Sequence, residues 1–401
     1  MPARAAPASV IHAAKHSPLG MPPAQFLRDY WQRHPLLIRN ALPGFTSPIE
    51  PDDLAGLACE DGVLARLIEH DAASDGWRVR HGPFAEDVFP GLPDHDWVLQ
   101  VQDVDKWDAD IRALLDQFTF LPRWRIDDIA ASFAARGGSA GARTSPCGMF
   151  LLQATGRSRW QIDAAPQPST ALRDGVELPL LRNFQPSHDW LLEPGDLLYL
   201  PPGMPHCDLA DAHSLAFAVT LCAPSAAELL GDYADTLAAS APDGLRYTDP
   251  GLVLPEDACE IDDAALQRVD ATLQHLRMDD PDQFGDWFGG FITSYRSGLL
   301  PVAGQAPPSH AAVEQVLLAG RHLLHHPWSR MAWRRTRRDP ASACLYAGGT
   351  THALTVVDAR RLAAADRIDG TLYAALDQAG RDAVIALLAA GHYHLDTEPG
   401  A

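Results

Sequence analysis

The stretch Glu193–His206, which reads EPGDLLYLPPGMPH, decides the fold of this chain. An acidic turn leads into the strand-like block Asp196–Leu200, and a bend stiffened by Pro and Gly then presents one histidine. Short apolar runs bounded by Pro and Gly are typical of buried strands. The stretch therefore predicts a strand, a tight bend and a histidine, His206, held in a fixed place after that bend.

This pattern resembles the second half of a cupin-type iron site. In such a site two ligands lie at positions i and i+2 of one strand and point to the same face, and a third comes from a distant strand. Two histidines and one carboxylate then leave open positions on the metal for a co-substrate and oxygen. The first pair, His-x-Asp, is expected shortly after a Gly-rich turn, and such a turn is present at Gly137–Gly141.

The two ligand positions after that turn read Arg143 and Ser145. There is no histidine between His95 and His188, so a shifted register cannot supply one. Arg143 carries a permanent positive charge that repels a divalent metal, and a serine hydroxyl is a poor replacement for a carboxylate. We therefore expect that His206 alone does not hold iron at useful affinity.

The residues themselves leave alternatives open. A rearranged metal site could use Asp208, because His206 and Asp208 have the His-x-Asp spacing on one strand. The guanidinium of Arg143 could instead sit where the metal charge would be, paired with an acidic group or an organic anion. It could also extend to solvent along its apolar stem.

Strand-like alternation recurs along the first half of the chain. The segments are Trp77–Arg80, Trp97–Val101, Phe150–Gln153, Arg157–Ile162, Asp196–Leu200 and Leu215–Leu221. Many short strands with Gly and Pro turns predict a mainly β fold with α-helices, in which a double-stranded β-helix, or jelly roll, comes first. Helical patterns take over after Pro224, and no internal repeat is present.

The second half of the chain predicts a helical domain and then a winged-helix-like domain. One helix face carries aromatic side chains at i, i+3 and i+4 spacing, which is typical of either a core or a subunit interface; its residues are Phe284, Trp287, Phe288, Phe291, Ile292 and Tyr295. A linker at 304–308, a helix at 311–324, a hairpin turning at Gly348-Gly349 and a helix at 381–390 follow. The predicted domains are an N-terminal extension (1–21), a jelly roll (22–224), a helical domain (225–302) and a winged-helix-like domain (309–396).

Composition narrows the class of protein. The chain has 401 residues and a net charge of −20, which argues against nucleic-acid binding by the chain as a whole because phosphate contacts supply most of that affinity. A basic cluster around Trp333 is the exception, and a winged helix with such a patch could contact RNA; a solvated surface is the alternative. The cluster comprises Arg330, Arg334, Arg335, Arg337 and Arg338.

Nothing in the sequence indicates secretion or a membrane. No apolar run approaches the ~18 residues that span a bilayer, and the N-terminus lacks the pattern of a signal peptide. The six cysteines are scattered without a C-x-x-C pair. These features favour the reducing cytoplasm.

The motifs together resemble the bacterial JmjC-type ribosomal oxygenases, cupin proteins related to a ribosomal-protein arginine hydroxylase. The resemblance rests on the entry segment Tyr30–Pro35, Trp77–Phe84, Leu121–Asp128, the Gly-rich turn, Gln153–Gly156 and Glu193–His206. It implies a jelly roll, a helical dimerisation domain and a winged helix, in a homodimer. It also implies Fe(II) and 2-oxoglutarate as cofactors, hydroxylation of an arginine as the activity, and a large-subunit ribosomal protein as the partner.

Carried over position by position, the resemblance assigns the retained metal ligand to His206. The other two ligand positions are Arg143 and Ser145, and the position that would anchor the far carboxylate of 2-oxoglutarate is Ser158. Arg157 and Arg159 should face away from the side of Ser158, because side chains alternate along a strand. The leading hypothesis is a family member with lost or impaired oxygenase activity and a remaining protein-binding role. The alternative is an active hydroxylase with a rearranged site.

Overall fold

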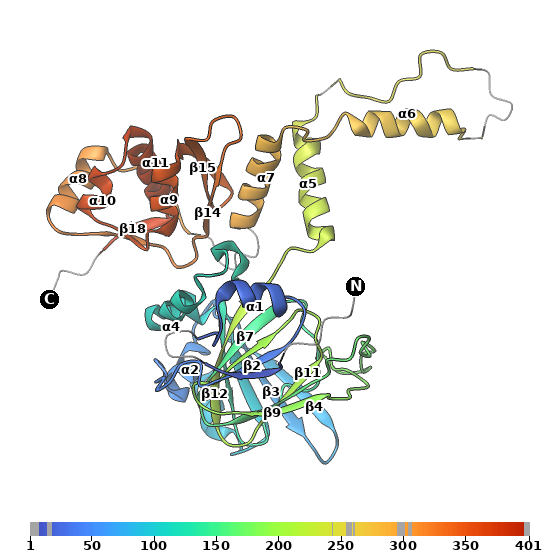
Figure 1. Ribbon diagram of the computed structural model, residues 1–401, viewed down its shortest axis with the longest axis vertical. Coiled ribbons are helices and arrows are strands. Elements are labelled where there is room, and N and C mark those ends of the chain that lie inside the picture. Colours follow the sequence, from blue (N-terminus) through green and yellow to red (C-terminus); the bar gives the residue numbers. More distant parts are fainter. Residues whose placement is uncertain are drawn as a thin grey trace. The chain divides into compact units, whose positions relative to one another are not determined.

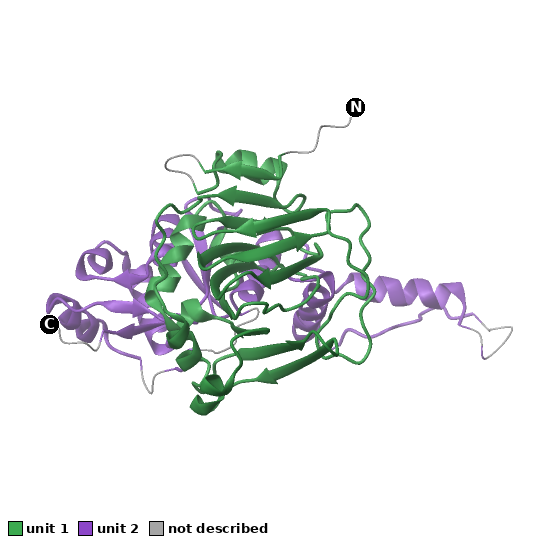
Figure 2. Cartoon of the chain, turned by 90° about the horizontal axis from the view of Figure 1, so that it is seen from below, with its two compact units in different colours: residues 1–223 green, residues 224–401 purple. Residues whose placement is uncertain are grey.

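The computed structural model describes residues 8–13, 18–242, 244–253, 259, 261–294, 301–303 and 307–396. The chain divides into two compact units, Met1–Ala223 (unit 1) and Pro224–Ala401 (unit 2), which Figure 2 colours separately. Most of the predicted linker at 304–308 and Tyr295 of the predicted aromatic helix lie outside the described residues. None of the described helices combines the length and the apolar character that crossing a membrane requires.

Within its described residues, unit 1 holds a larger sheet of nine strands in the order β1-β2-β10-β7-β12-β6-β5-β3-β4 (Figure 1). Neighbouring strands are antiparallel, except that β1 and β2 are parallel. The bounds are β1 (Val10–His12), β2 (Leu36–Arg39), β3 (Ala65–Asp71), β4 (Gly76–His81), β5 (Trp97–Val101), β6 (Ile129–Ala134), β7 (Gly148–Thr155), β10 (Leu197–Leu200) and β12 (Ser214–Leu221).

A smaller antiparallel sheet in the order β11-β8-β9 completes the jelly roll. Its strands are β8 (Ser158–Ile162), β9 (His188–Leu192) and β11 (His206–Ala210). The strands predicted from alternation are therefore confirmed, with the turn between β7 and β8 at Gly156, whose φ of 64° suits glycine. A Cβ there would also stand 1.9 Å from the carbonyl oxygen of His213.

The two faces of the larger sheet bury different partners, because side chains alternate along each strand. Phe150 and Leu152 of β7 pack with the helices of unit 1, whereas Leu151 packs with Trp160 and Ile162 of the smaller sheet. The space between the larger and the smaller sheet, where Leu151 packs, is the interior of the jelly roll. The helices are α1 (Pro23–Asp29), α2 (Pro51–Leu57), α3 (Val104–Trp107) and α4 (Ala109–Ala113), with 3₁₀ turns η1 (Glu86–Gly91), η2 (Leu114–Phe118) and η3 (Arg123–Arg125).

A disulfide that the scattered cysteines do not predict joins Cys147 and Cys222. The two residues flank the antiparallel pair Gly148 and Leu221, where β7 begins and β12 ends. Their Cα atoms lie 4.5 Å apart although 75 residues separate them in sequence. The β7–β12 ladder therefore brings the two thiols together, and the bond closes a long loop around the jelly roll.

The described part of unit 2 combines helices with two small antiparallel sheets, β14-β15-β16 and β17-β13-β18. Its helices are α5 (Ala226–Ser240), α6 (Asp263–Gln274), α7 (Pro281–Ser294), α8 (His310–Leu318), α9 (Val356–Ala364), α10 (Gly370–Ala374) and α11 (Gln378–Ala389). Its strands are β13 (Leu323–His325), β14 (Met331–Arg335), β15 (Ser342–Ala347), β16 (Thr350–Thr355), β17 (Arg367–Ile368) and β18 (Tyr393–Leu395). The predicted hairpin at Gly348-Gly349 joins β15 and β16, as expected.

One sequence prediction in unit 2 is wrong. The helix expected over 311–324 stops at Leu318, and Leu323 begins β13 instead. Gly320, with a φ of 80°, ends the helix, because the left-handed conformation favours glycine. Leu323 is fully buried and pairs with both Ile368 and Leu395, so sheet pairing and burial override the helical pattern.

The aromatic helix α7 has two different faces. Gly289 allows one face to approach β15, since a Cβ there would stand 2.4 Å from the ring of Tyr346. On the other face, Trp287 packs at 4.9 Å from the ring of Tyr233 in α5 and donates a 2.7 Å hydrogen bond to Asp232. Glycine in the middle of a helix lowers the stability of the helix by about 1 kcal/mol relative to alanine. The packing on both faces of α7 compensates for this loss.

Candidate ligand site in the jelly roll

His206 opens β11 on the inward face of the smaller sheet. It pairs with Ile162 of β8, its side chain is 2% exposed, and its ring stacks on that of Trp160 at 5.7 Å. Nδ1 lies 2.9 Å from the carbonyl oxygen of Met204, which can only accept, so Nδ1 carries the proton and Nε2 is the free acceptor. Burial, and then the charge of Arg143, lower the pKa of His206 to about 4, so the ring is neutral at pH 7.

Arg143 lies directly beside His206 through main-chain hydrogen bonds. The amide of Arg143 donates to the carbonyl of His206 at 2.9 Å, and the amide of His206 donates back to Arg143 at 2.9 Å. The guanidinium of Arg143 donates to Asp208 at 2.6 Å and to the carbonyl oxygen of Gly141 at 2.9 Å. Of the alternatives for Arg143, pairing with an acidic group is therefore the one that occurs.

Asp208 lies on the same face of β11 as His206, as the i, i+2 spacing predicts. Its pairing partner on β8 is Trp160, another inward residue. The carboxylate is 14% exposed and forms an ion pair with Arg143. A metal ion at this carboxylate would have to displace or approach a guanidinium cation, which like-charge repulsion opposes.

Ser145 serves the local turn. Its hydroxyl accepts the amide of Cys147 at 3.1 Å, and its carbonyl oxygen accepts the amide of Gly203 at 2.7 Å. Across the part of the chain that the structure describes, no cluster of three or more His, Cys, Asp or Glu side chains could hold a metal ion. The side chains around His206 therefore do not fit the Fe(II) centre that the motif resembles.

Ser158 occupies the inward face of β8 and is 7% exposed. Its hydroxyl donates to the Gln153 side-chain oxygen at 2.5 Å and accepts from the indole of Trp160 at 3.0 Å. Arg159 points outward and pairs with Asp189 at 2.9 Å, and the exposed Arg157 pairs with Asp211. The position expected to anchor 2-oxoglutarate therefore offers a short neutral hydroxyl that is already hydrogen bonded, and neither neighbouring arginine replaces it.

Sequence reasoning missed Arg66, a third charged residue of this interior. In β3, Leu67 faces the helix-covered core, so Arg66 faces the opposite, inward side of the sheet. Its Nε donates to the side chain of Gln100 on β5 at 2.7 Å. Burial, followed by the charge of Arg143, lowers the pKa of Arg66, whereas Asp208 acts in the opposite direction.

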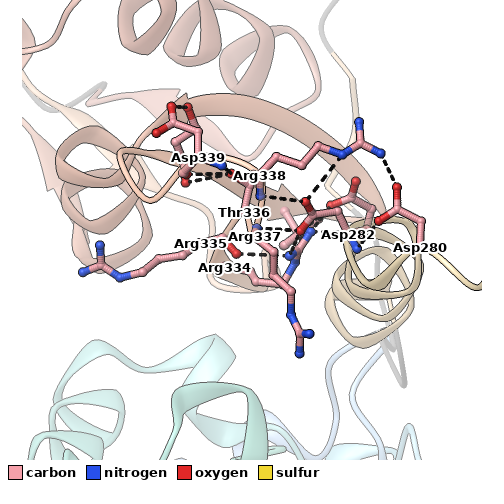
Figure 3. Close-up of polar contacts among 11 residues, drawn as sticks. Asp280, Asp282, Arg334, Arg335, Thr336, Arg337, Arg338 and Asp339 are labelled. Carbon is pink, nitrogen blue, oxygen red and sulfur yellow. Dashed lines mark hydrogen bonds and ion pairs between the residues drawn. The ribbon is translucent and has the colours of Figure 1, made fainter.

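Arg334 and Arg338 of the arginine cluster of unit 2 form ion pairs with acidic side chains (Figure 3). Arg334 of β14 donates to Asp282 at 2.7 Å and to Asp286 at 2.9 Å, both in α7, and to the hydroxyl of Tyr346 at 3.2 Å. Arg338 forms ion pairs with Asp280 and Asp282. Two of the arginines proposed for RNA contact are thus engaged by carboxylates within unit 2.

Two family models match the chain. The JmjC domain matches residues 113–229, and the ROXA-like winged helix matches residues 274–394. The first match spans Arg143, Ser158 and His206, and the second spans α7 together with the arginine cluster.

Known proteins resemble the chain over most of its length. It is 35% identical to the ribosomal protein uL16 3-hydroxylase of Escherichia coli (strain K12) over 295 residues, which are 71% of this chain and 74% of that protein. The X-ray structure of E. coli YcfD superimposes with a TM-score of 0.81 and 29% identity, covering 94% of this chain and 99% of that chain. A structure of YcfD, a ribosomal oxygenase, in complex with cobalt and 2-oxoglutarate gives a TM-score of 0.78 and 28% identity over the same shares.

Proposed function

Because the chain belongs to the ribosomal oxygenase family of JmjC proteins, we propose that it is a member without oxygenase activity that retains a protein-binding role. The observation that carries the proposal is the 2.6 Å ion pair between Arg143 and Asp208, beside the retained His206. The guanidinium of Arg143, which is always positively charged, stands at a position where the family motif has a metal ligand. The protein would then act by binding rather than by hydroxylation.

The co-substrate position supports the same proposal. A 2-oxoglutarate carboxylate needs a cationic or strongly donating partner, and charge-assisted hydrogen bonds are about twice as strong as neutral ones. Ser158 is neutral and already donates to Gln153. Arg143 and Ser145 would therefore weaken binding of the metal, and Ser158 would independently weaken binding of 2-oxoglutarate.

Restoring the metal ligands tests this proposal. We expect anaerobic calorimetric titration of metal-stripped wild type with Fe(II) to show no saturable binding. The double variant Arg143→His, Ser145→Asp should bind Fe(II), because it returns an imidazole and a carboxylate beside His206. The single variants Arg143→His and Ser145→Asp are the controls; each supplies only one ligand beside His206 and should bind Fe(II) less tightly than the double variant.

Tight, saturable Fe(II) binding by the wild type would instead support the alternative, an active hydroxylase that uses His206 and Asp208. Failure of the folded double variant to bind Fe(II) would also count against the proposal, since other features would then exclude the metal.

The family also suggests the partner and the compartment. The E. coli relative is named for ribosomal protein uL16, so we propose a large-subunit ribosomal protein as the partner of this chain, in the cytoplasm. The net charge of −20 is complementary to a basic protein and would accelerate their encounter.

A homodimer is the proposed assembly, and α6 supports it. None of the residues of this helix is buried in the single chain. Leu266, Val269 and Leu273 lie on one face of the helix, and their side chains are 55%, 45% and 61% exposed. A second copy would cover this apolar stripe, which water otherwise contacts.

Charged substitutions on that stripe test the dimer. Leu266→Glu with Leu273→Glu should raise the dimer dissociation constant at least about tenfold, because an unpaired charge is costly to bury. Ala264→Glu with Ala271→Glu adds the same charges at the same spacing on the opposite face and should leave it unchanged. Sedimentation velocity over a concentration series measures both; equal dissociation constants for the two variants would contradict the assignment of α6 to the interface.

A further inference from the structure

Two segments of unit 1 that lie far apart in the sequence meet through an arginine and two tryptophans. The first segment carries Trp31, and the second carries Trp124 and Arg125. The guanidinium carbon of Arg125 lies 5.8 Å from the ring centre of Trp31 and 5.7 Å from that of Trp124. The ring of Trp31 stacks in turn on that of the buried Tyr199, with 5.9 Å between the ring centres. The core therefore fixes Trp31, and cation–π contacts hold the guanidinium in place.

The half-buried guanidinium of Arg125 carries a charge that the protein does not balance. Within the described part of the chain, it forms no hydrogen bond and no ion pair; Asp29 pairs instead with Arg28 at 2.9 Å. Its Nε is sealed from water without a partner, whereas its two terminal nitrogens are not among the sealed atoms. Aromatic rings steady a cation without neutralising it, so Arg125 offers a pre-positioned charge and two open donor nitrogens to an anion.

The positions around Arg125 form a basic and aromatic surface in a chain whose net charge is −20. Arg33 and His34 of the first segment and Arg123 of the second are exposed. The ring of Trp124 is accessible too, since this residue is 36% exposed. Basic side chains that alternate with aromatic rings are typical of surfaces that bind single-stranded nucleic acid.

We propose that this surface, formed by Trp31, Arg33, Arg123, Trp124 and Arg125, binds single-stranded nucleic acid. A phosphate group accepts hydrogen bonds from the terminal nitrogens of Arg125, and a neighbouring base stacks on the exposed ring of Trp124. A duplex fits less well, because its bases already stack on one another and leave no free face. An acidic peptide would pair with the arginines but would gain little from the indole ring.

The acidity of the whole chain does not prevent such a local contact. Salt screens charges that lie more than about 8 Å away at physiological ionic strength, so distant carboxylates oppose the binding only weakly. The contact itself should depend on salt. Three phosphate contacts, to Arg33, Arg123 and Arg125, predict that the logarithm of the association constant falls with a slope of about −2 against the logarithm of the salt concentration.

Fluorescence anisotropy of a labelled RNA strand of about twelve nucleotides, titrated with the full-length protein, tests the surface. We expect saturable binding of the single strand and at least about tenfold weaker binding of its duplex. Arg125→Gln should weaken binding of the single strand about tenfold and make the salt slope shallower by about 0.7, because one phosphate contact is lost. Trp124→Ala should weaken binding about tenfold without changing the slope, because it removes stacking and not charge.

Arg159→Gln is the matched control for Arg125→Gln. Arg159 is an exposed arginine on the outer face of the smaller sheet, whereas Trp31 packs with the helices on the opposite side of the larger sheet. This variant should bind RNA as the wild type does. Trp124→Phe keeps an aromatic face and should recover most of the binding that Trp124→Ala loses. Circular dichroism checks the folding of each variant, and Arg123→Gln, at an exposed position, replaces Arg125→Gln if that variant unfolds.

Three results would overturn the inference. One is the absence of saturable binding, and another is equal affinity of the wild type and Arg125→Gln for the single strand. The third is a Glu-rich peptide that binds at least as tightly as the RNA and loses affinity in Arg125→Gln, since it would identify an acidic protein as the occupant. None of these measurements involves Fe(II), so failure of this surface and failure of the proposed function give different results.

Discussion

Removing the Cys147–Cys222 disulfide should lower the free energy of unfolding of unit 1 by about 4 kcal/mol. The bond closes a loop spanning 75 residues, and the chain-entropy model assigns this loss to greater freedom of the unfolded chain. The native state should change little, because Gly148 and Leu221 already hold the two ends together in the β7–β12 ladder. Urea unfolding of Cys147→Ser, Cys222→Ser, compared with the oxidised wild type, measures the difference.

Cys59→Ser is the control for that experiment, because Cys59 is a free and only half-buried cysteine of unit 1. It should change the unfolding midpoint much less than the double variant. Reductant should shift the wild type to the midpoint of the double variant. An unshifted wild type would mean that the two thiols are not bonded in the folded protein. In the proposed cytoplasmic setting, glutathione and thioredoxin would favour the reduced and less stable form.

Arg334→Ala should destabilise unit 2 by about 2–3 kcal/mol, because it removes a partly buried guanidinium from two carboxylates and a tyrosine hydroxyl. The donated bonds to Asp282 and Asp286 join β14 to α7. Without Arg334, the two carboxylates repel each other beside the buried ring of Tyr346, which itself donates to Asp286. Thermal unfolding followed by circular dichroism measures the loss.

Two further variants separate charge from geometry in this cluster. Arg334→Lys keeps the charge but lacks the fork that reaches three acceptors, so it should recover only a minor part of the stability. Arg335→Ala removes a guanidinium that lies over the ring of Trp333, and it should cost at most about 1 kcal/mol. Equal effects of the Arg334 and Arg335 variants would contradict a structural role for Arg334. Loss of RNA association in an Arg334 variant would then need a stability control.

Much of the fold could be predicted from the sequence, because its strongest signals are local. Alternation placed β5 and β12, and the Gly turn at Gly156 placed the β7–β8 corner. The same kind of signal failed at Leu323, since periodicity cannot show that a short apolar run pairs with strands formed much later in the chain.

The site was predictable where spacing is fixed by a motif and unpredictable where contacts join distant segments. The positions of Arg143, Ser145 and His206 follow from the Gly turn and the Pro-Gly bend. The choice of Asp208 as the partner of Arg143 depends on how β11 lies beside the segment after the turn, so the sequence left it open. Arg66 carries no motif, and only the sheet brings it to the same interior.

The paired amides and carbonyls of Arg143 and His206 separate the shape of the domain from its chemistry. These bonds use only peptide groups, which nearly every residue type provides, so they can hold the segment with many different side chains at position 143. Substitutions there should therefore leave the backbone pairing intact. A jelly roll can keep its shape whether or not its side chains bind a metal, so likeness of fold alone does not report turnover.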